Sequence, residues 1–363
     1  MRQLGTLCGV SVAAVSKAFN NHPSIPPATK EMILRKAREV GYVPNPEISR
    51  LMRAVAEGYH EHNKPTIAVL FPWSRKQDFA EESDIPTIQM IWKGLHQCAR
   101  EMGYRLDCFW LGSPHMSGKR LVNIFTARGL EALIIFSCPQ GYKDVSIDFS
   151  KFSVVAIGHL PFDPSPVTIE VDAFAIGTLA LKKLRQMGYT RPGFILMDAD
   201  LEQDEGRRYS AFHYLKEEFF SNQAPIPDIL MQTSHVKPWS LPNASEIDRL
   251  IGWVRKYKPD VVVSTFNEVK DWLVNSGFSV PQDIGFVSLN NPQMFNNSGT
   301  VIDWDHVGRK AMLLMDGLLS KYSRGVPHTA EIYTIAPTWF EGSSLASVKL
   351  SKSQRRPSLR KKK

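Results

Sequence analysis

The sequence contains few cysteines, and their spacing gives them no evident chemical use. The four cysteines, Cys8, Cys98, Cys108 and Cys138, are scattered, and no CxxC pair occurs. A zinc clamp or a redox dithiol needs such closely spaced pairs. A chain of 363 residues is also far longer than a small disulfide-stapled secreted module. We therefore expect reduced, buried thiols and no metal site.

Long apolar runs are also missing. No stretch of eighteen consecutive apolar residues occurs, and residues 1–20 lack the basic segment and apolar run of an export signal. The sequence therefore predicts a cytoplasmic protein with no membrane partner.

The common catalytic motifs GxGxxG, GxSxG, HExxH and the P-loop are absent. The SxxK match at Ser234–Lys237 stands alone and is followed directly by Pro238, which favours chance. His60 and His62 lie in a polar linker, where solvated side chains are the expected state. These patterns predict no enzyme, no catalytic residue and no cofactor.

The positive charge of the chain is concentrated at its two ends. The net charge is +8, and residues 343–363 carry eight Lys/Arg and no acid. Residues 1–56 carry eight basic and three acidic residues, or +5, whereas residues 57–342 carry 28 basic and 33 acidic residues, or −5. This asymmetry predicts a polyanionic partner for the N-terminal region. The C-terminal segment is typical of a basic disordered tail.

The N-terminal residues have the pattern of a helix-turn-helix. Short helical patterns cover residues 2–8, 12–19 and 28–40. Gly9 allows a tight turn, and Ser11 can cap the helix that follows. That helix would bury Val15 and expose Val12, Ala13, Ser16 and Lys17, whose short side chains and one cation suit a DNA major groove.

From Thr66 onward, strand-length apolar runs alternate with amphipathic helices, which is typical of parallel sheets covered on both faces. We expect a first series of strands at 66–71, 105–111, 132–136 and 154–158, and a second at 168–172, 193–197, 229–233, 260–265 and 284–289. The expected helices are 87–102, 118–128, 173–187, 203–221, 244–257 and 306–323. Two doubly wound lobes are predicted, with a ligand at the carboxyl ends of their strands.

The N-terminal block resembles the lactose-repressor (LacI/GalR) family of bacterial transcription regulators. The resemblance is carried by Gly9-Val10-Ser11, Val15-Ser16-Lys17-Ala18, Asn20 and Gly41–Pro46, and weaker matches such as Gly94, Asp172 and Gly308 continue to about Gly342. It implies a periplasmic-binding-protein-like core behind the small all-α domain. It also implies that residues 12–20 form the recognition helix and that Leu51 enters the minor groove. The DNA-contacting residues are then expected to be Ser11, Val12, Ala13, Ser16, Lys17, Asn20, Asn45 and Leu51.

The same resemblance implies an effector site. Arg208 matches the effector-binding arginine of the family, and Asn267 stands where a carboxylate is common. Asn290 and Asn291 likewise stand where the family commonly has two aspartates, so the carboxylates that the family usually offers to sugar hydroxyls are missing here. The candidate effector residues are Trp73, Ser137, His159, Arg208, Trp239, Asn267 and Asn290.

The expected organisation has four parts. These are a DNA-binding domain with a hinge helix at 1–56, a linker at 57–64, a two-lobed effector-binding and dimerisation domain at 65–342, and the tail at 343–363. Lobe 1 is expected at about 65–160 and 292–324, and lobe 2 at about 161–291 and 325–342. The expected function is a homodimeric repressor of operator DNA, controlled by a small-molecule effector, a carbohydrate, bound between the lobes. The alternatives are an exported-type sugar-binding protein and an enzyme with an appended DNA-binding domain.

Overall fold

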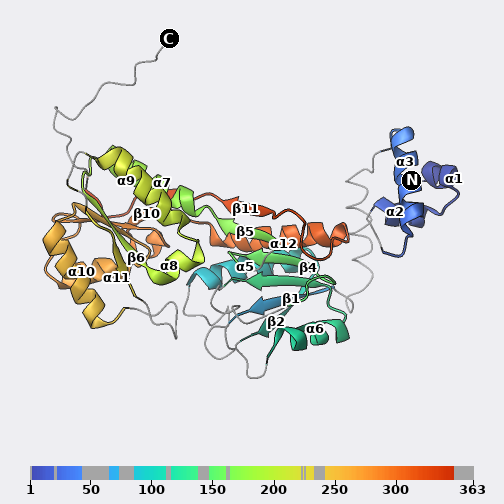
Figure 1. Cartoon of the computed structure of the whole chain (residues 1–363), viewed down its shortest axis with the longest axis horizontal. Helices are drawn as coiled ribbons and strands as arrows, with labels where there is room; N and C mark the ends of the chain where they lie inside the picture. The colour runs from blue at the N-terminus through green and yellow to red at the C-terminus, as the bar shows by residue number, and fades with distance from the viewer. Residues whose placement is uncertain are drawn as a thin grey trace, which may run out of the picture. The chain divides into compact units, whose positions relative to one another are not determined.

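The computed structural model describes most of the chain. The described residues are 2–19, 23–42, 65–72, 86–111, 116–137, 147–160, 164–221, 224, 226–232 and 242–346. The chain divides into two compact units that each combine separate stretches of sequence. Unit 1 comprises Met1–Glu170 and Trp304–Tyr333, and unit 2 comprises Val171–Asp303 and Thr334–Lys363 (Figure 1).

Three short helices begin the chain: α1 (Arg2–Cys8), α2 (Val12–Phe19) and α3 (Pro27–Glu39). They share a small apolar core of Leu4, Val15, Ala18, Ile33 and Ala37. Gly9 makes the turn between α1 and α2 with a φ of 64°, which favours glycine because a side chain is disfavoured there. The predicted helices at 2–8 and 12–19 are confirmed.

Unit 1 contains a six-stranded sheet in the order β11-β5-β4-β3-β1-β2. Its strands are β1 (Thr66–Phe71), β2 (Arg105–Trp110), β3 (Ala132–Phe136), β4 (Ser153–Ile157), β5 (Val167–Val171) and β11 (Ile332–Ile335), the last two of which end within the chain of unit 2. Its helices are α5 (Pro86–Glu101), α6 (Gly118–Ala127) and α12 (Trp304–Ser320).

Helices cover both faces of this sheet because alternate residues of each strand point to opposite sides. Leu70 packs with Leu121 and Phe125 of α6, whereas the neighbouring Phe71 contacts Trp92 of α5 with ring centroids 6.0 Å apart. Helices α5 and α12 lie side by side (Figure 1). Their approach requires glycine, since a Cβ on Gly308 would lie 2.0 Å from the Ile91 carbonyl oxygen.

Unit 2 contains a second six-stranded sheet in the order β12-β10-β9-β8-β6-β7. Its strands are β6 (Pro192–Met197), β7 (Ile229–Met231), β8 (Val261–Ser264), β9 (Gly285–Ser288), β10 (Ser298–Val301) and β12 (Thr338–Phe340). Its helices are α7 (Ala173–Met187), α8 (Asp198–Gln203), α9 (Arg207–Phe220), α10 (Ala244–Tyr257), α11 (Glu268–Asn275) and the short 3₁₀ helix η2 (Pro292–Phe295). Strands β7, β6, β8, β9 and β10 pair in parallel, and β12 closes the edge antiparallel to β10.

The predicted class of a helical N-terminal domain followed by two parallel-sheet α/β lobes is confirmed. The assignment of the strand at 168–172 to the second series is wrong, because β5 pairs with β4 in the first sheet. The chain crosses between units at 170/171, 303/304 and 333/334, about ten residues later than expected each time.

Several elements escaped prediction. The helix expected at 203–221 is α9, which begins only at Arg207, and the separate helix α8 before it was not expected; Glu205 and Gly206, with φ of 52° and 71°, lie between the two. A left-handed pair of residues cannot continue a right-handed helix, so the chain breaks there. Helix α11 and the strands β10, β11 and β12 were also not expected, because their sequences are short and carry mixed polar residues.

Candidate functional site

The first candidate surface is one face of α2. Ser11 caps this helix by accepting a hydrogen bond from the Ala14 backbone N–H at 3.1 Å. Val15 is fully buried, whereas Val12 is 43% exposed. Ala13 and Lys17 are also exposed, and Ser16 is half-buried. The helix therefore presents a surface of short side chains with one cation while its opposite face closes the three-helix core.

Three predicted DNA contacts, Asn20, Asn45 and Leu51, lie outside the described residues. The expected hinge helix after Asn45 lies there too, as do the candidate effector residues Trp73 and Trp239. For these positions the expectation from the sequence stands as a prediction.

In unit 1, two predicted effector residues meet at the carboxyl ends of neighbouring strands. Ser137 follows β3 and His159 follows β4, and the Ser137 hydroxyl donates a hydrogen bond to the His159 backbone carbonyl. The His159 Nδ1 atom lies 3.9 Å from a carboxylate oxygen of Glu170, a buried residue of β5 that the sequence reading did not single out. The Ser137 hydroxyl bonds to main chain and not to the imidazole, so this group is not arranged as a nucleophile with its base.

In unit 2, Arg208 lies among carboxylates. It is the second residue of α9, directly after the α8–α9 break, and its side chain is 12% exposed. Its guanidinium Nη1 lies 3.8 Å from Asp200 Oδ1, and its Nε lies 3.3 Å from Asp204 Oδ2. The Thr265 hydroxyl, which follows β8, donates a hydrogen bond to the other oxygen of Asp200. Arg208 is thus the cation of a buried polar cluster at the carboxyl ends of β6 and β8.

The contact between Arg208 and Asp204 leaves two polar atoms unsatisfied. Although Arg208 Nε and Asp204 Oδ2 are 3.3 Å apart, neither has a hydrogen-bond partner within the described part of the chain. A small cavity of about 10 Å³ is lined by Asp200, Asp204, Arg208, Tyr209 and Thr265, among others. That volume is at the lower limit for one water-sized group. Both residues with an unsatisfied atom therefore line a cavity whose volume is close to that of one hydroxyl group.

Burial dominates the electrostatics of this cluster. Removal from water raises the pKa of Asp200 and of Asp204 above the usual carboxyl range, and the nearby positive charge of Arg208 offsets only part of that rise. Asp198 and Asp200 lie close enough to repel each other, which adds to the rise at Asp200. The cluster accordingly favours a proton or a hydrogen-bond donor from a ligand.

The remaining candidates, Asn267 and Asn290, belong to a network of asparagines. The Asn267 side-chain amide donates to the Asn290 carbonyl at 2.8 Å and accepts from the Asn297 amide at 3.0 Å. Both ends of the Asn267 amide are thus used within the protein, and it ties together the loops after β8 and β9. Among the residues that the structure describes, the buried side-chain oxygen of Asn290 has no hydrogen-bond partner, so Asn290 keeps an acceptor available at this edge of the sheet.

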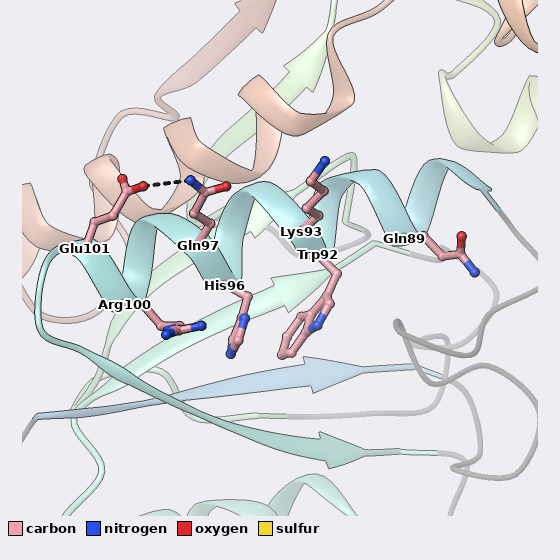
Figure 2. Close-up of a pocket in the computed structure, with 7 residues that line it drawn as sticks. All are labelled: Gln89, Trp92, Lys93, His96, Gln97, Arg100 and Glu101. Atoms are coloured by element: carbon pink, nitrogen blue, oxygen red, sulfur yellow. Dashed lines mark hydrogen bonds between the residues drawn. The ribbon is translucent and has the colours of Figure 1, made fainter.

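A larger groove of about 750 Å³ runs along α5 in unit 1. Figure 2 shows Trp92, His96 and Arg100 pointing to one side of the helix and Lys93, Gln97 and Glu101 to the other. The Trp92 and His96 rings stack 5.6 Å apart, and Glu101 is paired with Arg309 at 3.1 Å. The sequence reading named none of these residues as a site.

The residues that sequence reasoning missed are Asp200, Asp204, Thr265, Asn297 and Glu170. No role was predicted for the acidic stretch at 198–205, although its density of carboxylates next to Arg208 was a usable signal. Among the described residues no group of three potential metal ligands occurs, and no helix there is long and apolar enough to cross a membrane.

Comparisons with known proteins give a consistent answer. The family model "Bacterial regulatory proteins, lacI family" matches residues 1–45. The NTD biosynthesis operon regulator NtdR of Bacillus subtilis is 20% identical over 330 residues, which cover 86% of this chain and 90% of NtdR. The transcriptional repressor PurR of Haemophilus influenzae is 24% identical over 222 residues, which cover 60% of each chain.

Solved structures share the fold. The transcriptional regulator CelR in complex with cellobiose aligns with a TM-score of 0.57 at 16% identity, covering 94% of this chain and 98% of that one. The lac repressor dimer bound to operator and the anti-inducer ONPF aligns with a TM-score of 0.54 at 16% identity and the same coverage. Residues 1–45 of this chain are thus a DNA-binding domain of the lacI family of bacterial regulatory proteins, the two parallel-sheet units share the fold of the solved LacI-type regulators, and the chain is a DNA-binding transcriptional regulator.

Proposed function

We propose that the chain is a homodimeric repressor that reads an operator with α2 and responds to a carbohydrate effector. The observation that supports DNA reading is the exposed surface of Ser11, Val12, Ala13 and Lys17 on a helix whose other face is fully buried. Short side chains let the helix enter a major groove, and Lys17 can reach a base edge or a phosphate. One such helix reads only a few base pairs, so a dimer on a pseudo-palindromic site is expected. DNA as the target places the protein in the cytoplasm.

The carbohydrate effector is supported by the unsatisfied pair of atoms in unit 2. A hydroxyl group both accepts and donates a hydrogen bond. It could accept from Arg208 Nε and donate to Asp204 Oδ2, the two buried atoms that lack partners in the described part of the chain. An ammonium group would satisfy Asp204 but repel Arg208. The structural neighbour CelR, solved with cellobiose, is consistent with a sugar. Ser137, His159, Asn290 and, outside the described residues, Trp73 and Trp239 remain the other proposed contacts, with Asn267 supporting Asn290.

Two measurements test the two halves of this proposal separately. Selection of bound DNA from a random pool should yield a pseudo-palindrome, and light scattering should give a dimer. A single half-site, or no enrichment over random sequence, would refute operator reading. The recovered operator is then used to measure which members of a panel of neutral sugars, sugar acids and nucleosides release the protein from DNA.

A separate variant, Asp204→Asn, tests the proposed carbohydrate site. Asp204→Asn keeps the shape of the side chain but replaces a charged acceptor with a neutral one, and charge-assisted hydrogen bonds are about twice as strong as neutral ones. We expect the sugar that releases wild-type protein to bind this variant about tenfold more weakly, with operator affinity in the absence of sugar unchanged. Equal sugar affinity in both proteins would remove Asp204 from the site.

A further inference from the structure

Three polar residues form a stripe along the exposed side of α5 in unit 1. Lys93, Gln97 and Glu101 are spaced four residues apart, so they follow one another along one side of the helix, as Figure 2 shows. All three are exposed and line the groove of about 750 Å³. The helix rises about 12 Å between Lys93 and Glu101. The stripe therefore has a cation at one end, an amide in the middle and an anion at the other end.

The two charges of this stripe differ in how they are held. Gln97 donates a hydrogen bond to one Glu101 oxygen at 2.8 Å, and Arg309 of α12 donates to the other at 3.1 Å. These hydrogen bonds lower the pKa of Glu101, so this carboxylate is fixed in place and ionised at neutral pH. Lys93 has no ion pair or hydrogen bond within the described part of the chain. The monomer thus offers one cation that can still take an acidic partner.

The edge strand beside this helix is incompletely covered. Phe71 of β1 contacts Trp92 of α5, and the register of the two strands places Trp110 of β2 on the same face of the sheet. The β1 residues on that face are fully buried, whereas their partners in β2 are only half-buried: Leu106, Cys108 and Trp110. Apolar surface that is left partly open next to polar side chains is typical of a protein–protein interface.

We propose that the stripe of Lys93, Gln97 and Glu101, with the adjoining face of β2, is the surface through which two copies of this chain associate. The inference rests on the proposed homodimer and names its interface. In a two-fold dimer the same patch lies on both sides, so the patch must complement itself. Two α5 helices that cross antiparallel at Gln97 bring Lys93 to the partner's Glu101, and the reciprocal pair forms at the same time. An acidic partner of another kind would pair with Lys93 but would be repelled by Glu101.

Charge reversal in the full chain tests this surface. Lys93→Glu and Glu101→Lys each turn both attractive pairs into repulsive ones, so each should weaken self-association by at least about tenfold. The double variant Lys93→Glu/Glu101→Lys should restore the dissociation constant of wild type. Lys119→Glu makes the same change at an exposed lysine of α6 and should have no effect. Sedimentation equilibrium measures each dissociation constant, at low salt because salt screens exposed charges.

Mixing the two single variants separates charge pairing from damage to the fold. A heterodimer of Lys93→Glu with Glu101→Lys places two glutamates of one protomer against two lysines of the other, so dimers should reappear in the mixture. The thermal midpoint of Lys93→Glu should equal that of wild type, since Lys93 has no partner within the described part of its own chain.

Three results would contradict this interface. If both single variants dimerise as tightly as wild type, the two copies meet elsewhere and the inference is wrong. If the variants fail to dimerise even when mixed, the loss does not come from these charge pairs, which also overturns it. A wild-type protein that stays monomeric would refute the proposed homodimer itself, and this interface with it.

Discussion

The exposed face of α2 and the buried cluster around Arg208 are built in opposite ways. On α2, every candidate residue belongs to one continuous stretch, and its neighbours along the chain decide which side chains are exposed. The Arg208 cluster gathers Asp200 from α8, Asp204 from the α8–α9 break and Thr265 from the end of β8. A surface made by one helix tolerates substitution without loss of fold. A buried cluster of charges does not, because removing one member leaves the opposite charge buried without a partner, which costs stability.

The substitution Arg208→Met tests whether the buried cluster depends on each of its members, and it should have the largest effect. Methionine fills a similar volume but leaves Asp200 and Asp204 buried without a cation. Removing one partner of a buried ion pair costs about 3 to 5 kcal/mol. We expect the free energy of unfolding, measured by urea denaturation, to fall by about that amount at neutral pH. A loss below about 1 kcal/mol would mean that the two carboxyls are already protonated there.

The contrast between local and tertiary control also appears within α12. Gly308→Ala would push a Cβ against the Ile91 carbonyl, whereas the Cβ of Gly317→Ala meets nothing within 4 Å. Overpacking costs about 1 to 3 kcal/mol or more. Replacing an open helical glycine by alanine stabilises by up to about 1 kcal/mol. Urea denaturation should therefore give opposite signs for two identical changes in one helix, and equal signs would contradict the close α5–α12 approach.

Lys17→Gln tests the exposed face of α2. A contact to a base edge is worth about 1 to 3 kcal/mol of discrimination, so operator affinity should fall about 5- to 150-fold. Binding to the selected operator and to single-base variants of it would be measured by gel shift. Loss of preference at one half-site position marks Lys17 as a base reader; a uniform loss across all sites marks it as a phosphate contact. The thermal midpoint of the protein should stay unchanged.

Ser11→Ala tests whether α2 is held locally. The substitution removes the acceptor for the Ala14 N–H, and loss of an N-terminal cap costs about 1 kcal/mol. Amide hydrogen exchange should speed up in α2 and leave the two α/β units unaffected. Ser11→Asp, which retains a capping oxygen, should restore protection. Faster exchange throughout the chain would contradict the independence of the three-helix domain.

The smallest effect concerns pH. Because burial raises the pKa of Asp200 and Asp204, the folded protein binds protons more tightly than the unfolded chain. Their contribution to stability is complete below the ordinary carboxyl pKa and declines as pH rises through the raised value. The stability of wild type relative to Asp204→Asn should therefore improve as pH falls from neutral toward the carboxyl range. Urea midpoints at a series of pH values measure this difference, and a constant difference would refute the raised pKa of Asp204.

Much of the fold follows from sequence because its signals are local. The strands of both sheets with continuous apolar runs, such as Thr66–Phe71 and Ala132–Phe136, were predicted to the residue, and so was helix Ala244–Tyr257. The elements that were missed lack such runs. Strand β11 lies at the edge of the first sheet, and three of its own four residues are exposed. Strand β12 pairs with β10, nearly forty positions earlier in the chain. Their identity as strands comes from the partner.

The candidate sites divide along the same line. By itself, the sequence determined which residues α2 exposes, since helical periodicity, the Ser11 cap and the Gly9 turn act within twelve residues of chain. The resemblance to the LacI/GalR family also singled out Arg208. Only the tertiary structure decided that Thr265 bonds to Asp200, next to Arg208, and that the Asn267 amide bonds to Asn290 and Asn297. Asp200, Asp204 and Arg208 belong to one segment after β6, but Thr265 and the three asparagines come from segments beside other strands of the sheet. Strand order is set by packing between distant segments, which no local pattern encodes.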